Sequence, residues 1–178
     1  MTLQKLSLVL GGANSGKSAL GERLVRSAGK RLVYIATAQA FDAEMEAKIA
    51  QHRAQRGTDW RTVETPHDAA QALESVTGDE AVLLDCATLW LSNHLLAESD
   101  VEAEADRLLA ALAACRGPVV VVSNETGLGV VPDNALARRF RAAQGHLNQR
   151  LAAEAGLVVF VAAGLPMVLK GELPEGVA

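Results

Sequence analysis

Aromatic residues, cysteines and long apolar runs are all scarce in this 178-residue chain. Phe, Trp and Tyr make up 3% of it, so few rings are present to stack bases, and a single-strand nucleic-acid binder is disfavoured. The two cysteines, Cys86 and Cys115, have neither zinc-type spacing nor the density of a disulfide scaffold, and we expect core residues of a protein from a reducing compartment. No apolar run approaches the ~18 residues of a membrane span, and the N-terminus lacks a signal-peptide pattern, which together predict a cytoplasmic protein without a membrane span.

Positive charge is not in excess either. The chain has 17 Lys and Arg against 21 Asp and Glu, a formal net charge of -4. This balance argues against nucleic acid as the main partner, because no surplus of cations is available to neutralise a phosphate backbone. With 178 residues, 49% of them hydrophobic, the chain has material for one core and little for a second. One domain spanning residues 1–178 is predicted.

The N-terminal segment contains a complete phosphate-binding loop. An apolar run over residues 6–10 leads into GGANSGKS, which matches G-x-x-x-x-G-K-[ST] and is followed by a helical pattern. Its residues are Gly11, Gly12, Ala13, Asn14, Ser15, Gly16, Lys17 and Ser18. The glycines let backbone N–H groups approach phosphate oxygens, Lys17 would reach the terminal phosphates, and the hydroxyl of Ser18 would bind Mg²⁺. An ordinary glycine-rich turn is the alternative, but the strand and helix context favours a site for a nucleoside triphosphate and a metal ion.

Alternating strand and helix patterns follow this loop. Short apolar runs predict strands at 6–10, 31–36, 81–84, 119–122 and 157–162. Apolar spacings of three and four residues predict helices directly after the loop, from about 42 to 57, and over 68–76, 101–115 and 134–155. This alternation predicts an α/β protein with a three-layer P-loop NTPase fold and a mostly parallel central sheet, similar to that of the recombinases.

Three local patterns refine this prediction. The four consecutive valines at 119–122 predict a strand in the centre of the sheet, because a half-exposed strand would carry polar residues. The polar residues Ser92 and Asn93 predict a break in regular structure. In the last helix, the spacing of Leu136, Phe140, Leu147 and Leu151 predicts one apolar face.

Polar residues just after the strands are the first candidates for chemistry, because ligands gather at the carboxyl ends of the strands in such a sheet. Asp85 ends the strand at 81–84, where a carboxylate can hold Mg²⁺ directly or through water; a helix cap or turn residue is the alternative. Ser123, Asn124 and Glu125 follow the valine strand. Glu125 could orient or deprotonate a substrate hydroxyl, or it could simply be part of a turn.

His52 differs from the other three histidines in its neighbours. It lies on the helix predicted to begin near residue 42, close to Arg53 and Arg56, and a histidine beside two arginines could contact a phosphate. Surface histidines on amphipathic helices are also commonly just solvated. Spacing alone leaves both interpretations open.

Four features of the chain together resemble one enzyme family. They are the P-loop, the His-Arg-x-x-Arg pattern at 52–56, Trp60, and the NE-x-G-x-G-x-VP-x-N pattern at 124–134. In combination they are similar to the bifunctional adenosylcobinamide kinase and adenosylcobinamide-phosphate guanylyltransferase of cobalamin biosynthesis, and the likeness covers nearly the whole chain. Two positions depart from it: Gly57 stands where many members have proline, and Ala142 stands where aspartate is expected.

The resemblance implies two reactions at one nucleotide site. In the first, the hydroxyl of the aminopropanol arm of adenosylcobinamide attacks the terminal phosphate of ATP or GTP, with Lys17 and Mg²⁺ stabilising the charge. In the second, GMP passes from GTP through a covalent bond to His52, pyrophosphate leaves, and Arg53 and Arg56 hold the phosphates. The resemblance also implies a homotrimer.

The resemblance further implies a GTP site beyond the P-loop, in which Glu64 accepts hydrogen bonds from guanine N–H groups. The implied residues are Ala36, Thr37, Ala38, Arg53, Ala54, Gln55, Arg56, Glu64 and Asp85. The corrinoid pocket is expected near Asn124, Glu125 and the loop to Asn134, because these residues follow a central strand. Two other functions stay open: a small-molecule kinase in which His52 is a bystander, and a nucleotide-switched binding module.

Overall fold

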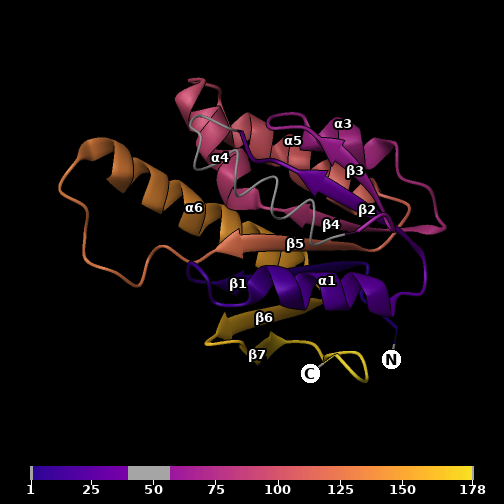
Figure 1. Cartoon of the computed structure of the whole chain (residues 1–178). Coiled ribbons are helices and arrows are strands. Elements are labelled where there is room, and N and C mark those ends of the chain that lie inside the picture. Colours follow the sequence, from indigo (N-terminus) through magenta and orange to yellow (C-terminus); the bar gives the residue numbers. More distant parts are fainter. Residues whose placement is uncertain (1, 40–56, 178) are drawn as a thin grey trace.

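The computed structural model describes residues 2–39 and 57–177, which form one sheet with helices on both faces (Figure 1). The strand order is β3-β2-β4-β5-β1-β6-β7, and all neighbouring strands are parallel except β6 and β7. The strands are β1 (Leu6–Gly11), β2 (Arg31–Ala36), β3 (Trp60–Glu64), β4 (Glu80–Asp85), β5 (Val119–Asn124), β6 (Leu157–Ala162) and β7 (Leu165–Lys170). The helices are α1 (Lys17–Ser27), α3 (Ala69–Glu74), α4 (Ala87–Leu96), α5 (Val101–Ala114) and α6 (Ala135–Glu154).

Of the described helices, α1 covers one face of the sheet and the others cover the opposite face (Figure 1). Leu20 and Leu24 of α1 are buried against side chains of the strands. Gly21 lies where α1 crosses β4 and β5, because an added Cβ would be 2.9 Å from Leu83 Cδ1 and 3.0 Å from Val122 Cγ2. The missing side chain therefore permits close contact between α1 and the middle of the sheet.

The centre of the sheet is β5, with β4 on one side and β1 on the other. All four of its valines are fully buried. Val119 and Val121 belong to the core beneath α3 to α6, and Val120 and Val122 belong to the core beneath α1. A strand with helices on both faces exposes neither side to water, and the predicted central position is confirmed.

The predicted fold class is also confirmed: the protein is a three-layer α/β structure with a mostly parallel sheet. The strands at 31–36 and 157–162 have the predicted bounds. Cys86 and Cys115 are buried and free, as expected of core residues. Among the helices that the structure describes, none is both long and apolar enough to cross a membrane.

The predicted break at Ser92 and Asn93 is wrong, because both residues lie within α4. Asn93 is buried, and its Nδ2 donates hydrogen bonds to the carbonyl groups of Thr37, at 2.8 Å, and Pro66, at 2.9 Å. A buried amide whose donors are satisfied in this way is compatible with a helix interior. The polar side chain therefore marks a contact between α4 and two loops.

Two strands at the edges of the sheet, β3 and β7, are missing from the sequence prediction. β7 follows β6 through Ala163 and Gly164, whose φ values of 51° and 78° are typical of a two-residue hairpin turn. β3 pairs with β2 alone, and its residues Arg61 and Thr62 are exposed. An edge strand with exposed polar residues lacks the continuous apolar run by which the inner strands are recognised.

The N-terminal part of α6 extends past the sheet (Figure 1). Leu147 and Leu151 are buried, and Phe140 packs against the core while partly exposed. Leu136 follows the same spacing but is 54% exposed, so the predicted apolar face is only partly buried. The apolar spacing continues beyond the point where other elements are present to cover it.

Candidate active site

The P-loop connects the end of β1 to the start of α1. Asn14 and Gly16 have positive φ values of 53° and 96°, which turn the chain back toward the helix. The Nζ of Lys17 donates a hydrogen bond to the carbonyl of Gly12, 2.9 Å away, and closes the loop. The loop's backbone therefore curves in front of the N-terminus of α1, where unpaired N–H groups and the helix dipole favour a bound anion.

The β6–β7 turn supports the loop from one side, which the sequence did not indicate. The N–H of Gly164 donates to the carbonyl of Ser15, at 2.8 Å. A Cβ on Gly16 would be 3.1 Å from the Cα of Gly164, and a Cβ on Gly11 would be 2.7 Å from the carbonyl oxygen of Val161. A side chain at either glycine would therefore crowd β6–β7, more severely at Gly11 than at Gly16.

The predicted nucleotide residues that the structure describes lie in register along the carboxyl edge of the sheet. Ala36 pairs with Glu64 on one side and with Asp85 on the other. Gly11, the first residue of the P-loop, pairs with Asn124. The edge thus presents residues of β3, β2, β4, β5 and β1 in one row.

These residues also share the face that α1 covers. Tyr34, Leu83 and Val122 come two positions before Ala36, Asp85 and Asn124 in their strands. The side chains of these three earlier residues lie in the core beneath α1. Side chains alternate along a strand, so residues two positions later point to the same face. The structure therefore brings Ala36, Asp85 and the P-loop together on one side of the sheet.

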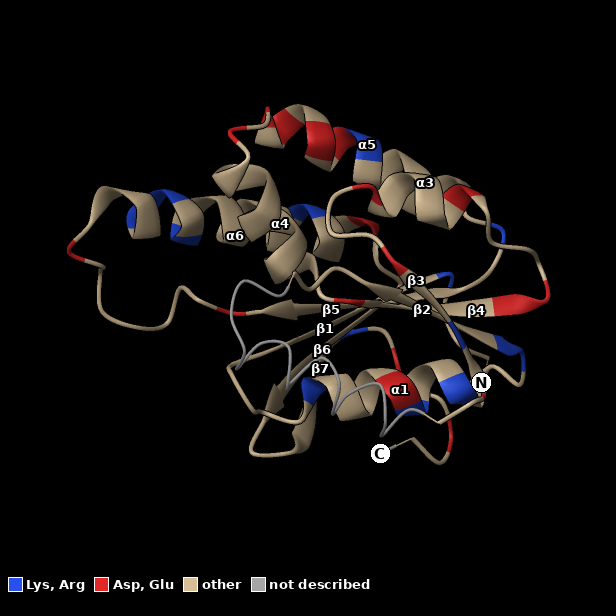
Figure 2. Ribbon diagram, turned by 45° about the horizontal axis from the view of Figure 1, so that its top comes forward, with Lys and Arg blue, Asp and Glu red and all other residues tan. Residues whose placement is uncertain are grey.

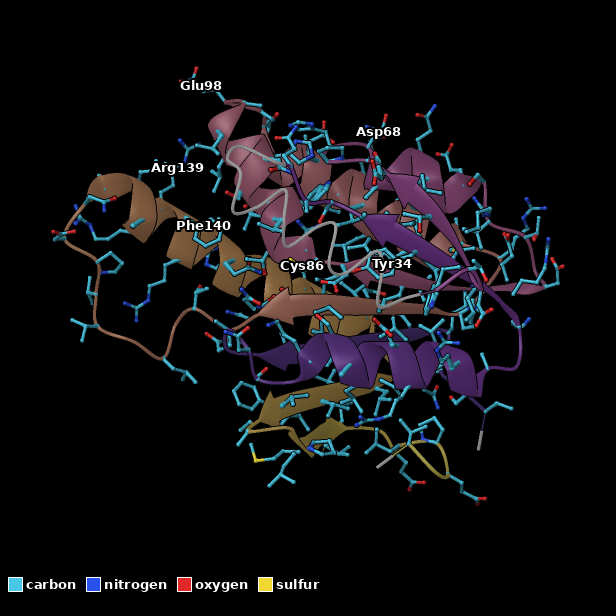
Figure 3. The ribbon with its side chains drawn as sticks, viewed as in Figure 1. Tyr34, Asp68, Cys86, Glu98, Arg139 and Phe140 are labelled. Carbon is cyan, nitrogen blue, oxygen red and sulfur yellow. The ribbon has the colours of Figure 1, made fainter. Side chains whose placement is uncertain are left out.

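Asp85 is held at the last position of β4, half-buried. Its Oδ2 accepts a hydrogen bond of 2.9 Å from the hydroxyl of Tyr34. The N-cap of α4 is Cys86, whose Sγ accepts from the N–H of Leu89, so the alternative of Asp85 as a helix cap is wrong. Figure 3 labels Tyr34 and Cys86, which mark this part of the molecule. One carboxylate oxygen of Asp85 is oriented by Tyr34, which leaves the other able to bind a cation.

Two buried residues, Cys86 and Thr37, lie beside Asp85. Burial, and then the charge of Asp85, raise the pKa of the Cys86 thiol to about 12, so it stays protonated and is not a nucleophile. The hydroxyl of Thr37 donates to the carbonyl of Cys86, at 2.8 Å, and accepts from its N–H, at 2.9 Å. Thr37 therefore connects the loop after β2 to the end of β4. Of the other predicted nucleotide residues, Ala38 is half-buried and Glu64 is exposed.

A buried polar network anchors the end of β5. The Oγ of Ser123 donates to Asn148 Oδ1 at 2.7 Å and accepts from Gln144 Nε2 at 2.9 Å. Ser123 lies within the strand and faces α6, so it belongs to this network and not to a loop at the ligand edge. Thr88, Gln144 and Asn148 were missed in the sequence, where the only signal is polar residues among the apolar positions of their helices.

Glu125 begins the long loop before α6. Its N–H donates to the carbonyl of Gly11 at 3.1 Å, which places the start of the loop beside the P-loop. Further along, Leu128, Val130 and Val131 are 81%, 94% and 67% exposed. The loop therefore starts beside the P-loop and carries exposed apolar side chains further along.

Arginines on the first turns of α6 fold this loop back onto the helix. Arg138 donates to the carbonyl of Asp133, at 2.7 Å, and Arg141 donates to that of Gly127, at 2.6 Å. Figure 2 shows these basic residues on the part of α6 nearest the loop, and Figure 3 labels Arg139 and Phe140 there. The apolar loop thus has a basic border.

Five predicted residues, His52, Arg53, Ala54, Gln55 and Arg56, lie outside the described residues, and their roles stay predictions. Gly57 has a φ of 72°, which proline cannot adopt, so the backbone here differs from what a family member with proline would have. Ala142, the other departure, is exposed on α6.

The family model and the curated relatives of this chain agree with one another. Residues 7–169 match a protein-family model described as cobinamide kinase / cobinamide phosphate guanyltransferase. A bifunctional adenosylcobalamin biosynthesis protein, CobP, from Pseudomonas aeruginosa is 49% identical over 168 residues, which cover 93% of this chain and 97% of that protein. A protein of the same description, CobU, from Salmonella typhimurium is 40% identical over 179 residues, with 92% and 98% covered. Among solved structures, the RadB recombinase is 19% identical with a TM-score of 0.49, covering 89% of this chain and 75% of that one.

Proposed function

This chain belongs to the cobinamide kinase / cobinamide phosphate guanyltransferase family and is an enzyme of cobalamin biosynthesis with both activities. We propose that the row of residues around the P-loop serves the two reactions in turn. The observation that carries the proposal is the placement of the P-loop and Asp85 on one face of one sheet edge, in a chain that matches the family over residues 7–169. The substrate of the first reaction is adenosylcobinamide, and the phosphate donor is ATP or GTP.

In the kinase step, the P-loop and the N-terminus of α1 bind the phosphates through backbone N–H groups. Lys17, whose amine lies at the Gly12 carbonyl, would exchange that hydrogen bond for the terminal phosphates. The substrate hydroxyl then attacks the terminal phosphorus, and the cationic amine stabilises charge on the transferring group.

The residues for a divalent cation fit that role. Ser18 is the second residue of α1, directly after Lys17, and Asp85 faces the same side of the sheet with one oxygen oriented by Tyr34. A hydroxyl and a carboxylate are the hard oxygen donors that suit Mg²⁺, which when bound would neutralise phosphate charge.

In the guanylyltransferase step, we propose His52 as the nucleophile at the α-phosphorus of GTP. A neutral imidazole attacks, pyrophosphate leaves, and the resulting phosphoramidate passes GMP to adenosylcobinamide phosphate. Arg53 and Arg56 would hold the phosphates, and Glu64 would accept from guanine. Four strand spacings separate β3 from β1, about 19 Å, so a nucleotide reaching both Glu64 and the P-loop would lie across the carboxyl edge.

The loop of residues 125–134 is our candidate for contact with the corrinoid. Its exposed side chains Leu128, Val130 and Val131 suit the apolar faces of a large ring, and Glu125 is tied to the P-loop strand. Such a contact would place the aminopropanol arm next to the terminal phosphate. The homotrimer, the cytoplasmic location and the single catalytic domain expected from the sequence stay predictions.

Mass spectrometry after incubation with GTP tests the covalent step. We expect one added GMP on the wild type, mapped to His52, and none on His52→Ala. His146→Ala is the matched control, because His146 is exposed on α6, which covers the face of the sheet opposite α1, and it should label as the wild type does. Equal labelling of His52→Ala and wild type would remove His52 from the mechanism.

The kinase step is tested separately by phosphorylation of adenosylcobinamide with ATP and with GTP. Lys17→Ala should abolish it. Phosphoryl transfer without any release of pyrophosphate would indicate the simple kinase instead. Nucleotide binding without either reaction would indicate the nucleotide-switched module.

A further inference from the structure

Asn124 is the half-buried last residue of β5, between the two parts of the site that would hold a triphosphate and its cation. β5 is flanked by β1, which leads into the P-loop, and by β4, which ends at Asp85. Asn124 pairs with Gly11, whereas Asp85 pairs with Val122. Asn124 therefore lies two residues beyond the level of Asp85, about 7 Å further along the strand direction.

The side chain of Asn124 points to the same face as the P-loop helix. Val120 and Val122 of β5 lie in the core beneath α1, and Asn124 follows them at the same alternation. Ser123 points the other way, where it bonds to Asn148. The Asn124 amide makes no hydrogen bond to any residue that the structure describes, and it is available to a ligand.

Both main-chain polar groups of Asn124 are held by helix side chains. Its N–H donates to the Oγ1 of Thr88, at 2.7 Å, and its carbonyl accepts from the Nδ2 of Asn148, at 3.0 Å. The next N–H, of Glu125, donates to the carbonyl of Gly11. Thr88 and Asn148 are 6% and 5% exposed, so water competes little for these bonds. The amide is thus carried by a backbone fixed before any ligand binds, as electrostatic catalysis requires.

The strand order decides which part of the nucleotide would be near this amide. A triphosphate bound by the P-loop on β1, with a cation held by Asp85 on β4, would place its terminal phosphate near the end of β5, which lies between those strands. A carboxamide offers two donors on Nδ2 and an acceptor on Oδ1. It can therefore contact a phosphate oxygen and the attacking hydroxyl together.

Resting on the kinase reaction proposed above, we propose that Asn124 is a catalytic residue for phosphoryl transfer, with Nδ2 donating to an oxygen of the terminal phosphate and Oδ1 orienting the substrate hydroxyl. In that step the hydroxyl oxygen bonds to the terminal phosphorus, and the bond from that phosphorus to the β,γ-bridging oxygen breaks. The nucleoside diphosphate leaves with the electron pair, and the hydroxyl proton passes to solvent water.

The experiment compares the wild type with Asn124→Ala, Asn124→Asp and the control Gln149→Ala, which removes an exposed amide from α6. Three quantities are measured: the rate of adenosylcobinamide phosphorylation, the affinity for GDP, and the affinity for a non-hydrolysable GTP analogue. Asn124→Ala should slow phosphorylation about 100-fold, by analogy with the loss of one preorganised donor, and keep GDP affinity within about twofold. Asn124→Asp should be slower still and should lose affinity for the GTP analogue selectively, because its charge repels the terminal phosphate.

The contrary outcomes are distinct. Phosphorylation by Asn124→Ala within about threefold of the wild type would overturn the proposal. So would an equal loss of GDP and analogue affinity in Asn124→Asp, since the terminal phosphate would then not be what the residue contacts. Failure of the wild type to phosphorylate adenosylcobinamide would refute the proposed function itself. The comparison of GDP and GTP-analogue affinities needs no corrinoid, so it would still test the role of Asn124 in that case. Thermal unfolding of each variant shows whether it is folded. If Asn124→Ala is not folded, Asn124→Asp, which keeps the size of the side chain, is compared with the wild type instead.

Discussion

Replacing Gly11 with alanine should destabilise the protein and weaken nucleotide binding more than the same replacement at the adjacent Gly12. A Cβ on Gly11 would collide with the Oγ of Ser15 and lie 2.7 Å from the carbonyl oxygen of Val161. A Cβ on Gly12 would have nothing within 4 Å. The two substitutions are chemically identical and one residue apart, so their difference isolates packing between β1 and β6.

The expected magnitude follows from the contact with Val161. A carbon atom approaches a carbonyl oxygen to about 3.3 Å, so β1 or β6 must move by about 0.6 Å to accept the methyl group of Gly11→Ala. Overpacking of this kind costs about 1–3 kcal/mol of folding free energy. The P-loop N–H groups move with the strand, and misplacement of binding groups by such a fraction of an ångström should weaken nucleotide binding about 10- to 100-fold.

Urea unfolding and calorimetric titration with GTP measure the two effects. Gly12→Ala should stay within about 0.5 kcal/mol of the wild type in stability. Gly11→Ala and Gly12→Ala with the same stability and the same GTP affinity would refute the argument that β6 sets the shape of the loop.

Three further predictions concern a buried hydrogen bond, a titrating carboxylate and a buried thiol. Ser123→Ala should cost about 1–3 kcal/mol in urea unfolding because it leaves buried partners unpaired, whereas Ser7→Ala should be near neutral, since the equally buried Ser7 hydroxyl has no partner among the described residues. Burial alone would raise the pKa of Glu80, but hydrogen bonding, above all from Arg61, lowers it below the ordinary 4.5. A carboxylate whose pKa is lowered by folding stabilises the folded state at pH values above its unfolded-state pKa, and this stabilisation is lost as the pH falls through its folded-state pKa. The stability difference between wild type and Arg61→Leu should therefore shrink from pH 7 to pH 3. With its pKa raised by burial to about 12, Cys86 should resist iodoacetamide at pH 8 until the protein is denatured, as read by mass spectrometry.

Each of these has a plain contrary result. Equal costs for the two serine variants would mean that the network on α6 contributes no stability. A constant difference between wild type and Arg61→Leu across the acid range would mean that Glu80 does not titrate with folding. Rapid labelling of Cys86 in the native protein would contradict its burial.

Local patterns in the chain were sufficient to predict the inner strands. The runs at 31–36 and 119–122 are apolar on both faces, a pattern typical of strands that are covered by helices on both sides. The polar residues Ser92 and Asn93 of α4 led to a wrong prediction of a break, because the polarity of Asn93 reflects tertiary contacts and not local structure. Asn93 is polar because two loops from distant parts of the chain bond to it, and nothing in the neighbouring sequence indicates those loops.

The candidate site was predictable to a similar, partial degree. The P-loop depends on consecutive residues, so its pattern is visible in sequence. Asp85 was inferred from its place after an apolar strand. The contribution of β6–β7 to the loop through Gly164, and the fixing of Asn124 by Thr88 and Asn148, depend on residues 24 to 149 positions apart along the chain and have no local signature.

The sequence by itself determined what is short-range: the phosphate-binding loop, the apolar strands, and, through its resemblance, the family and its two reactions. The tertiary structure alone decided what those residues face. Parallel pairing places Glu64, Ala36 and Asp85 at one level, and alternation along each strand directs them to the side of α1. The same pairing puts β5 between the P-loop strand and the Asp85 strand. Because strand order follows from long-range packing, and not from any local pattern, only the folded chain identifies Asn124 as the residue positioned over the terminal phosphate in the kinase reaction that we propose.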